Sequence, residues 1–224
     1  MKPVIRLLTV DAAGTLIRPW PSVGAVYAQT AREHGIIADD KEIDRRFYMV
    51  LGNIQKNQSI TLGEEKDFWK TVVLKTFQPF AKPIEIEPVF EKLWDLFAQG
   101  DHWRLSENAE TTLQALRDRG YRIALLSNND SRLRNVIQDL GIASIFEQIF
   151  ISSEIGFEKP NPKIFKYVER EMNASAEEIL HLGDSYSRDF EGAKGAGWSA
   201  LLFGKPKIEK DQILDFQELL AILP

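Results

Sequence analysis

The chain contains no cysteine, which excludes disulfide bonds, catalysis by a thiolate and metal sites built on cysteine sulfur. It also lacks any run close to the roughly 20 apolar residues that a membrane-spanning helix needs. Met1 to Pro3 leads directly into a predicted strand without a signal-peptide pattern, so we expect a cytoplasmic protein with no membrane partner. A net charge of −5 and a pI near 5.4 lack the basic character of nucleic-acid-binding proteins, so we expect no such partner.

The length of 224 residues, 44% of them hydrophobic, suits one domain with a substantial insertion or two small domains. Residues 22–100 show helical periodicity and no convincing strand. Thr61 to Glu64 has the pattern of a capping box at the start of a helix. We therefore expect a small bundle of four amphipathic helices, around residues 22–35, 43–54, 64–77 and 89–97.

From about residue 105 onward, predicted helices and strands alternate. Together with Leu7–Val10, this gives five strands, at 7–10, 121–126, 148–152, 179–182 and 198–203, and helices at 107–119, 131–140, 162–172 and 213–223. Such alternation predicts an α/β fold with a doubly wound, Rossmann-like, mostly parallel sheet. The expected core domain comprises residues 1–16 and 104–224, and residues 17–103 form an inserted helical domain.

The first predicted strand ends in a group of polar and small residues. The apolar run Leu7–Val10 is typical of a strand buried on both faces, and Asp11 follows it directly. Open α/β sheets bind ligands at the carboxyl ends of their strands. Gly14 permits a tight turn, and Thr15 can bind either a ligand oxygen or the turn itself. Taken alone, the segment also fits an ordinary turn that follows a strand.

Three further polar residues, Ser127, Lys159 and Asp184, also follow predicted strands, so they should meet Asp11 at one edge of the sheet. This set suits phosphoryl transfer by a carboxylate nucleophile, in which water then cleaves an aspartyl-phosphate. Each residue alone has a structural explanation, as a turn, a surface charge or a helix cap. Their joint occurrence at successive strand ends favours the catalytic interpretation.

A cation is needed to offset the repulsion between two carboxylates. Asp11 and Asp184 are suitable ligands for Mg²⁺, a hard cation that prefers oxygen and retains several waters. The backbone carbonyl of Ala13 is a further candidate ligand, because this role needs no particular side chain. Lys159 supplies a second positive charge, and Ser127 with nearby backbone N–H groups can bind the phosphoryl oxygens of a small phosphorylated substrate.

These segments resemble the four motifs of the haloacid dehalogenase (HAD) superfamily, in the branch whose α-helical cap is inserted between the first two motifs. The matching segments are Asp11-Ala12-Ala13-Gly14-Thr15-Leu16, Leu126-Ser127-Asn128, Lys159-Pro160, and Gly183-Asp184-Ser185 with Asp189. The resemblance implies that Asp11 is the nucleophile and a metal ligand, that Asp184 is a metal ligand, and that Asp189 orients the metal site. It also implies that the phosphoryl group is bound by the second and third motifs, through Ser127, Asn128 and Lys159, with Thr15 beside the nucleophile.

The chain departs from this family at Ala13. Phosphatases of the family carry an aspartate there, which protonates the leaving oxygen and then activates water. Loss of positioned acid/base help typically costs about 10²- to 10⁴-fold in rate. The interpretations left open are a slow phosphatase, a phosphatase whose substrates need no acid, one in which another group substitutes, and a non-catalytic module that binds a phosphorylated ligand or a protein.

The metal-independent 2-haloacid dehalogenases of the same superfamily also lack that aspartate. They usually carry tyrosines where Ala13 and Phe165 stand and a small polar residue where Asp184 stands. An uncompensated second carboxylate beside Asp11 would cost several kcal/mol. Asp184 therefore favours a Mg²⁺-dependent phosphatase-like site over dehalogenation.

Several other residues could contribute to a site, but a structural role is the simpler expectation. We expect His181 to pack inside the sheet and Arg18 and Arg188 to be solvated, although both arginines are near the motifs. Trp69 and Trp94 are expected to belong to the core of the helical insertion, because aromatic residues at helical spacing are usually buried.

Overall fold

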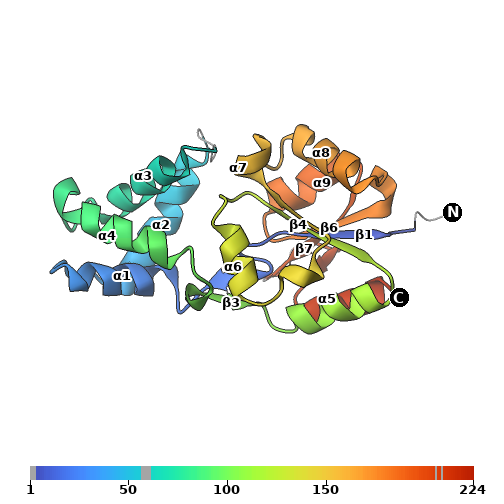
Figure 1. Cartoon of the computed structure of the whole chain (residues 1–224), viewed down its shortest axis with the longest axis horizontal. Coiled ribbons are helices and arrows are strands. Elements are labelled where there is room, and N and C mark those ends of the chain that lie inside the picture. Colours follow the sequence, from blue (N-terminus) through green and yellow to red (C-terminus); the bar gives the residue numbers. More distant parts are fainter. Residues whose placement is uncertain (1–3, 57–61, 205, 208) are drawn as a thin grey trace.

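A six-stranded parallel sheet forms the centre of the molecule (Figure 1). The structure is a computed structural model that describes residues 4–56, 62–204, 206–207 and 209–224. The strand order is β5-β4-β1-β6-β7-β8, so β1 lies inside the sheet between β4 and β6. The strands are β1 Leu7–Val10, β4 Arg122–Ser127, β5 Gln148–Ile151, β6 Ile179–Gly183, β7 Ser199–Phe203 and β8 Gln212–Ile213. The predicted doubly wound α/β fold is thus confirmed.

Helices cover both faces of the sheet, which explains why its central strands are continuously apolar. All four residues of β1 are buried, and alternate residues contact opposite layers. Figure 1 shows α8 and α9 on one side and α5 on the other. One layer comprises α5 Ala109–Asp118, α6 Leu133–Asp139 and α10 Leu219–Ile222, and the other comprises α8 Pro162–Met172 and α9 Gly192–Gly195.

The chain between β1 and β4 contains the expected four-helix bundle, which has its own hydrophobic core. No helix in the described ranges has the length and apolarity of a membrane span. The third helix begins at Glu65 without a side-chain cap from Glu64, and Thr61 of the expected capping box lies outside the described residues. The helices are α1 Val23–Glu33, α2 Asp40–Ile54, α3 Glu65–Phe77 and α4 Pro83–Leu96.

A short antiparallel ribbon joins the bundle to the sheet. It pairs β2 (Ile17–Pro19) with β3 (Trp103–Leu105), so the chain leaves and re-enters the core side by side. The sequence analysis did not predict this ribbon, because strands of three residues, one of them with a proline, show no recognisable alternation. The pairing therefore holds together the segment that enters the bundle and the segment that returns from it to the sheet.

The C-terminal segment differs from the predicted helix at 213–223. Gln212 and Ile213 instead form β8, a sixth strand, and a 3₁₀ turn at Phe216–Glu218 precedes the short α10. The α7 helix, Ser152–Ile155, was also not predicted. Both errors concern elements of two to four residues, which are too short for periodicity to reveal.

We predict that Gly24→Ala destabilises the protein by about 1–3 kcal/mol, because the added methyl group would overpack the contact between α1 and α2. A Cβ at Gly24 would overlap the carbonyl oxygen of Asp40, and the Gly24 N–H donates to Asp44 Oδ1 at 2.8 Å. Urea unfolding followed by tryptophan fluorescence measures the change.

Gly52→Ala is the matched control, since Gly52 is also helical but has no atom within 4 Å of the added Cβ. This substitution should raise the free energy of unfolding by about 0.5–1 kcal/mol, because alanine favours helix more than glycine does. Equal effects of the two substitutions would contradict the proposed close packing.

Candidate active site

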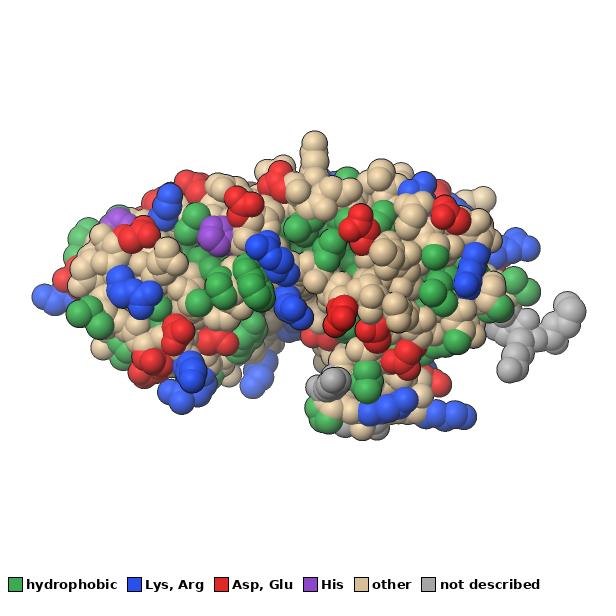
Figure 2. All heavy atoms as spheres, turned by 90° about the horizontal axis from the view of Figure 1, so that it is seen from below, with side chains coloured by type: hydrophobic (Ala, Val, Ile, Leu, Met, Phe, Trp, Pro, Cys, Tyr) green, Lys and Arg blue, Asp and Glu red, His purple; other side chains and the backbone are tan. Residues whose placement is uncertain are grey.

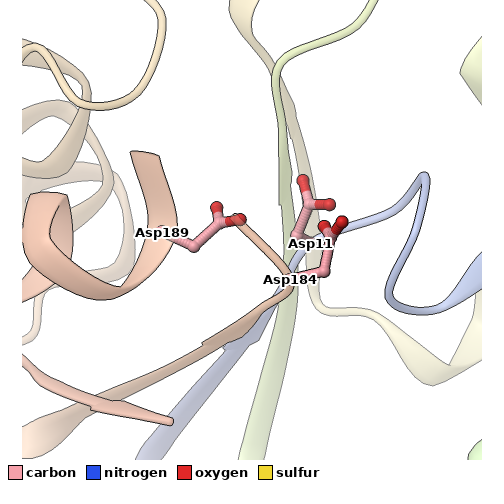
Figure 3. Close-up of side chains that lie close together, drawn as sticks. All are labelled: Asp11, Asp184 and Asp189. Carbon is pink, nitrogen blue, oxygen red and sulfur yellow. The ribbon is translucent and has the colours of Figure 1, made fainter. Parts of the chain in front are cut away.

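Three carboxylates gather at the carboxyl edge of the sheet. Asp11 follows β1, Asp184 follows β6, and Asp189 lies on a π-helical turn, η4 (Tyr186–Glu191). One oxygen of each lies within 4.8 Å of the others, and Figure 3 shows Asp11 and Asp184 with their carboxyl groups adjacent. The convergence follows from topology, because β1 and β6 are parallel neighbours and their polar residues come immediately after the last paired positions.

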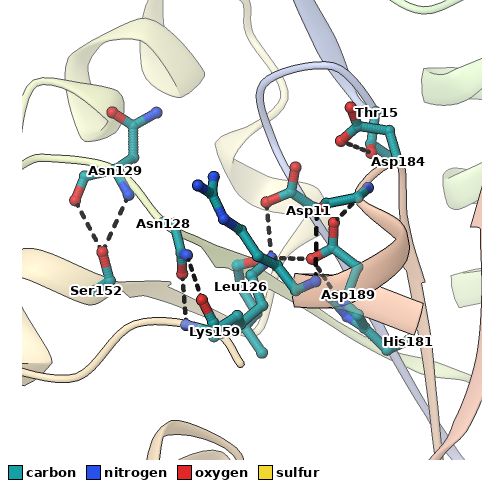
Figure 4. Close-up of polar contacts among 12 residues, drawn as sticks. Asp11, Thr15, Leu126, Asn128, Asn129, Ser152, Lys159, His181, Asp184 and Asp189 are labelled. Atoms are coloured by element: carbon teal, nitrogen blue, oxygen red, sulfur yellow. Dashed lines mark hydrogen bonds and ion pairs between the residues drawn. The ribbon is translucent and has the colours of Figure 1, made fainter. Parts of the chain in front are cut away.

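Lys159 lies under these carboxylates and is almost completely buried. Its Nζ donates to Asp11 Oδ1 at 2.8 Å and to the Leu126 carbonyl at 2.7 Å, and it pairs with Asp189 Oδ1 at 2.6 Å (Figure 4). Burial alone would lower the pKa of Lys159, but the charges of Asp11 and Asp189 reverse this and raise it. The ammonium group therefore stays charged and neutralises part of the acidic cluster.

Asp189 is fully engaged with protein groups. Its Oδ1 contacts Lys159 and accepts from His181 Nε2 at 3.1 Å, and its Oδ2 accepts from the Ser185 N–H at 2.9 Å. Desolvation alone would raise the pKa of Asp189, but Lys159 and His181 lower it below its usual range. Asp189 is therefore an ionised residue that positions Lys159.

His181 is buried within β6, as expected from the sequence. Its Nδ1 lies 2.9 Å from the Thr9 hydroxyl, and its Nε2 donates to Asp189. Desolvation and the charge of Lys159 lower the pKa of His181, so the neutral ring fits these two bonds. The contact with Asp189 was not predicted, because it joins a strand to a helical turn eight residues later.

Asp11 and Asp184 differ from Asp189 in their environments. Asp11 is buried, and desolvation, opposed by Lys159 and assisted by Asp189 and Asp184, raises its pKa to about 6. Asp184 lies at the exposed rim, where desolvation and the charge of Asp189 raise its pKa as well. Both carboxylates therefore lie in a field of excess negative charge, and a divalent cation between them would relieve it.

Gly14 is required by the turn that brings the first motif beside Asp184. Its φ is +99°, and a Cβ there would lie 2.5 Å from Asp184 Oδ2. The hydroxyl of Thr15 donates to Asp184 Oδ1 at 3.3 Å, which links the turn to the second metal-ligand candidate. Ala13 lies in the same turn and is one of the residues that line a cavity.

The two residues of the second motif lie at different depths. Ser127 is the buried last residue of β4, one position beyond the level of Asp11. The Asn128 amide donates to the Lys159 carbonyl and accepts from the Lys159 N–H, both at 2.8 Å. Asn128 therefore anchors the backbone of Lys159, a structural contact that the motif alone did not indicate.

A cavity of about 390 Å³ separates this edge of the sheet from the helical bundle. The surface is hollowed between the two parts, and basic side chains gather beside the hollow (Figure 2). Arg18 and Arg188 both line this cavity, where Arg18 is exposed, as expected, and Arg188 is half-buried. Arg188 Nη2 also donates to Gln55 Oε1 of the bundle at 2.8 Å. Trp69 and Trp94 line the cavity as well as packing against the bundle core.

A polar cluster that the sequence analysis missed joins the sheet domain to the bundle. Asp130 accepts from Trp69 Nε1 at 2.6 Å and from Arg132 Nε at 2.8 Å. The Arg132 guanidinium lies 3.7 Å from the Trp94 ring centroid. The polar run after β4 was visible in the sequence, but its tryptophan partners are distant along the chain.

Comparisons with known proteins agree with this arrangement. The family model for haloacid dehalogenase-like hydrolases matches residues 5–197. The chain belongs to this family. The mouse haloacid dehalogenase-like hydrolase domain-containing protein 3 is 33% identical over 204 residues, which cover 88% of this chain and 81% of the mouse protein. The glyceraldehyde 3-phosphate phosphatase of Methanothermobacter thermautotrophicus is 35% identical over 107 residues, 47% of each protein.

The fold is also found among solved structures of HAD hydrolases. YfnB from Bacillus subtilis, described as a HAD-hydrolase bound to magnesium, superposes with a TM-score of 0.77 at 21% identity, over 98% of this chain and 99% of YfnB. At this level of identity the likeness concerns the fold alone.

Lys159→Met should destabilise the protein by about 3–5 kcal/mol, because it leaves buried carboxylates without their counter-charge. The matched control is Lys166→Met on α8, whose exposed pair with Glu169 should contribute only about 0–1 kcal/mol. Urea unfolding at pH 7 measures both changes. Similar losses for the two variants would contradict the central role of the buried ammonium.

The raised pKa of Asp11 predicts a pH-dependent stability. The folded state binds this proton with a pKa of about 6, whereas an unfolded aspartate has a pKa of about 3.9. The contribution of Asp11 is thus fully present below pH 4 and is lost as the pH rises through 6. Between pH 4.5 and 7, without added divalent cation, the wild type should lose about 2 kcal/mol relative to Asp11→Asn.

Urea unfolding of the two proteins at several pH values measures this difference. The comparison cancels the titration of groups that do not interact with Asp11, whereas the lowered pKa of His181, which the charge of Asp11 also influences, acts in the opposite direction. Parallel pH profiles would show that Asp11 has an ordinary pKa in the folded protein.

Proposed function

We propose that this HAD-like hydrolase is a Mg²⁺-dependent phosphatase that hydrolyses small phosphomonoesters through a phosphorylated Asp11. The main supporting observation is that a buried carboxylate, bonded to a buried ammonium at 2.8 Å, adjoins a second carboxylate at the floor of a cavity. The partial likeness to a glyceraldehyde 3-phosphate phosphatase supports the same reaction class.

The acidic cluster is chemically suited to Mg²⁺. Asp11 and Asp184 would bind the ion, with the Ala13 carbonyl as a further ligand, whereas both oxygens of Asp189 already contact protein groups. When bound, Mg²⁺ would supply positive charge that offsets the charge of the transferring phosphoryl group. Hard oxygen ligands and excess negative charge are the features that this ion requires.

Asp11, Lys159 and Ser127 have separate roles in the proposed reaction. Lys159 holds Asp11 Oδ1 by a hydrogen bond and favours the ionised form of Asp11. A carboxylate oxygen of Asp11 can then attack phosphorus while the ester P–O bond breaks, and the electron pair of that bond leaves with the ester oxygen. Water then attacks the phosphorus of the aspartyl-phosphate, releasing phosphate and the Asp11 carboxylate. Ser127 and Lys159 would bind the non-reacting phosphoryl oxygens.

We further propose that residues 17–103 act as a cap domain over this site. The cap contributes the upper wall of the cavity through side chains such as Phe47, Tyr48 and Trp69, and it would exclude water during the reaction. The contacts of Arg188 with Gln55 and of Asp130 with Trp69 connect the cap to the sheet domain in this closed arrangement.

Two other functions, dehalogenation and ligand binding without turnover, lead to different outcomes. In a dehalogenase, the carboxylate of Asp184 would stand beside Asp11 with no cation to offset its charge. Ala13 is the feature that favours a non-catalytic module, because no carboxylate stands at the usual acid position.

Asp11→Asn should abolish phosphate release from p-nitrophenyl phosphate in Mg²⁺, because an amide is not a competent nucleophile. Chelation of Mg²⁺ should abolish it in the wild type too. Asp118→Asn, an exposed substitution on α5, should retain full activity. Phosphate release and trapping of phosphorylated Asp11 are the measurements.

The proposal fails if Asp11→Asn remains as active as the wild type. Halide release from 2-haloacids without metal would establish dehalogenation instead. Binding of phosphorylated ligands with no turnover of any ester would establish the non-catalytic module.

A further inference from the structure

The upper wall of the cavity is unusually aromatic for a site that receives a dianion. All four cap helices contribute rings, with Tyr27 from α1, Phe47 and Tyr48 from α2, Trp69 from α3, and Phe90 and Trp94 from α4. Phe47 stacks on Trp69 with centroids 6.4 Å apart, and Tyr48 meets Phe47 edge-on at 5.2 Å. Such a wall favours a flat apolar group over a sugar or polyol, whose hydroxyls would lose water without gaining partners.

The lower end of the same cavity lacks a suitable proton donor, among the described residues, for a poor leaving group. Ala13 and Asp184 both line this cavity, and the alanine side chain offers no acid to protonate the departing oxygen. Arg18 and Arg188 line the cavity, but a guanidinium does not release its proton at neutral pH. Among the other described residues that line the cavity, Tyr48 is a weak acid whose pKa is raised further by desolvation and by Asp44, and the Asp130 carboxylate already accepts hydrogen bonds from Trp69 and Arg132.

The missing acid restricts the leaving groups that can depart. A phenol-type oxygen leaves as a phenolate, whose conjugate acid has a pKa near 10, as in tyrosine. An alkoxide resembles hydroxide, whose conjugate acid has a pKa near 15.7, and requires protonation as the bond breaks. The arginines can stabilise a departing phenolate by charge without transferring a proton.

We propose that the substrate is a phosphate monoester of a phenol-type hydroxyl, whose aromatic ring occupies the cavity lined by the cap helices. This assignment rests on the proposed phosphatase activity. Asp11 attacks phosphorus, the bond from phosphorus to the aryl oxygen breaks, and the oxygen leaves with the electron pair and takes a proton from solvent. Water then releases phosphate from Asp11, so the products are inorganic phosphate and a phenol.

The test compares three substrates with Mg²⁺ present. Phenyl phosphate has the ring and the phenolate leaving group, benzyl phosphate has the ring but an alkoxide leaving group, and acetyl phosphate has a good leaving group without a ring. We expect kcat for phenyl phosphate to exceed that for benzyl phosphate by at least about 100-fold. We also expect KM for phenyl phosphate to be at least tenfold lower than KM for acetyl phosphate.

Ala13→Asp tests the acid requirement directly. A carboxylic acid at position 13 should accelerate benzyl phosphate hydrolysis by about 10²-fold or more and should narrow the gap to phenyl phosphate. This internal comparison removes the intrinsic difference in reactivity between the two esters. An unchanged ratio in Ala13→Asp would overturn the leaving-group argument.

Tyr48→Ala tests recognition of the ring, with Met49→Ala as its matched control. The two residues are neighbours on α2 with exposed fractions of 54% and 53%, but only Tyr48 lines the cavity. Tyr48→Ala should raise KM for phenyl phosphate several-fold while leaving KM for acetyl phosphate unchanged, and Met49→Ala should change neither value.

The outcomes separate this inference from the proposed function. Acetyl phosphate hydrolysis with no preference for phenyl phosphate, or equal turnover of phenyl and benzyl phosphates, would overturn the aryl assignment and leave the phosphatase intact. Failure to hydrolyse all three esters would remove the phosphatase proposal and the aryl assignment together.

Discussion

The buried ammonium of Lys159 is the interaction on which the acidic edge of the sheet depends. It contacts Asp11 at 2.8 Å and Asp189 at 2.6 Å, so one cation is shared by two carboxylates in a region shielded from water. Asp184 is a third carboxylate without such a partner. With all three ionised, three negative charges and one positive charge leave a net charge of −2, which matches one Mg²⁺. Lys159 is thus the permanent counter-charge of the cluster, and the proposed Mg²⁺ would offset the negative charge that remains.

The sheet topology determines the position of this cluster, and the inserted bundle forms the opposite wall of the cavity above it. Because β1 lies between β4 and β6, residues that are more than a hundred positions apart meet within hydrogen-bond distance, as Lys159 and Asp11 do. The β2–β3 ribbon tethers both ends of the bundle beside the same edge. The acidic edge is therefore built on the ends of strands, whereas the opposite wall of the cavity belongs to helices, which polar contacts such as Trp69 with Asp130 and Arg188 with Gln55 connect to it.

The sequence predicts the floor of the site far better than its wall. Asp11 and Asp184 were located in advance because strand order converts positions in the chain into one edge of a sheet, whatever the details of packing. The bond between Trp69 and Asp130 spans 61 positions and depends on how the bundle is oriented, which periodicity does not encode. The hydrogen bond between Arg188 and Gln55 was missed for the same reason, since it spans 133 positions and joins the bundle to the sheet side of the cavity. The short β2, β3 and β8 were missed because two or three residues show no period.

Ala13 and the aromatic wall affect the chemistry in the same direction. An apolar lining lowers the effective dielectric around the reacting group, which strengthens the attraction of Lys159 and the arginines for developing negative charge. A stronger electrostatic field can stabilise a departing anion that no acid protonates, provided that this anion is already weakly basic. A polar, water-filled cavity would weaken that field and would make the missing carboxylic acid more costly. In the proposed reaction, an alanine at position 13 is therefore compatible with an aromatic cavity lining. The lining strengthens the electrostatic stabilisation of the departing anion, and this stabilisation reduces the need for an acid.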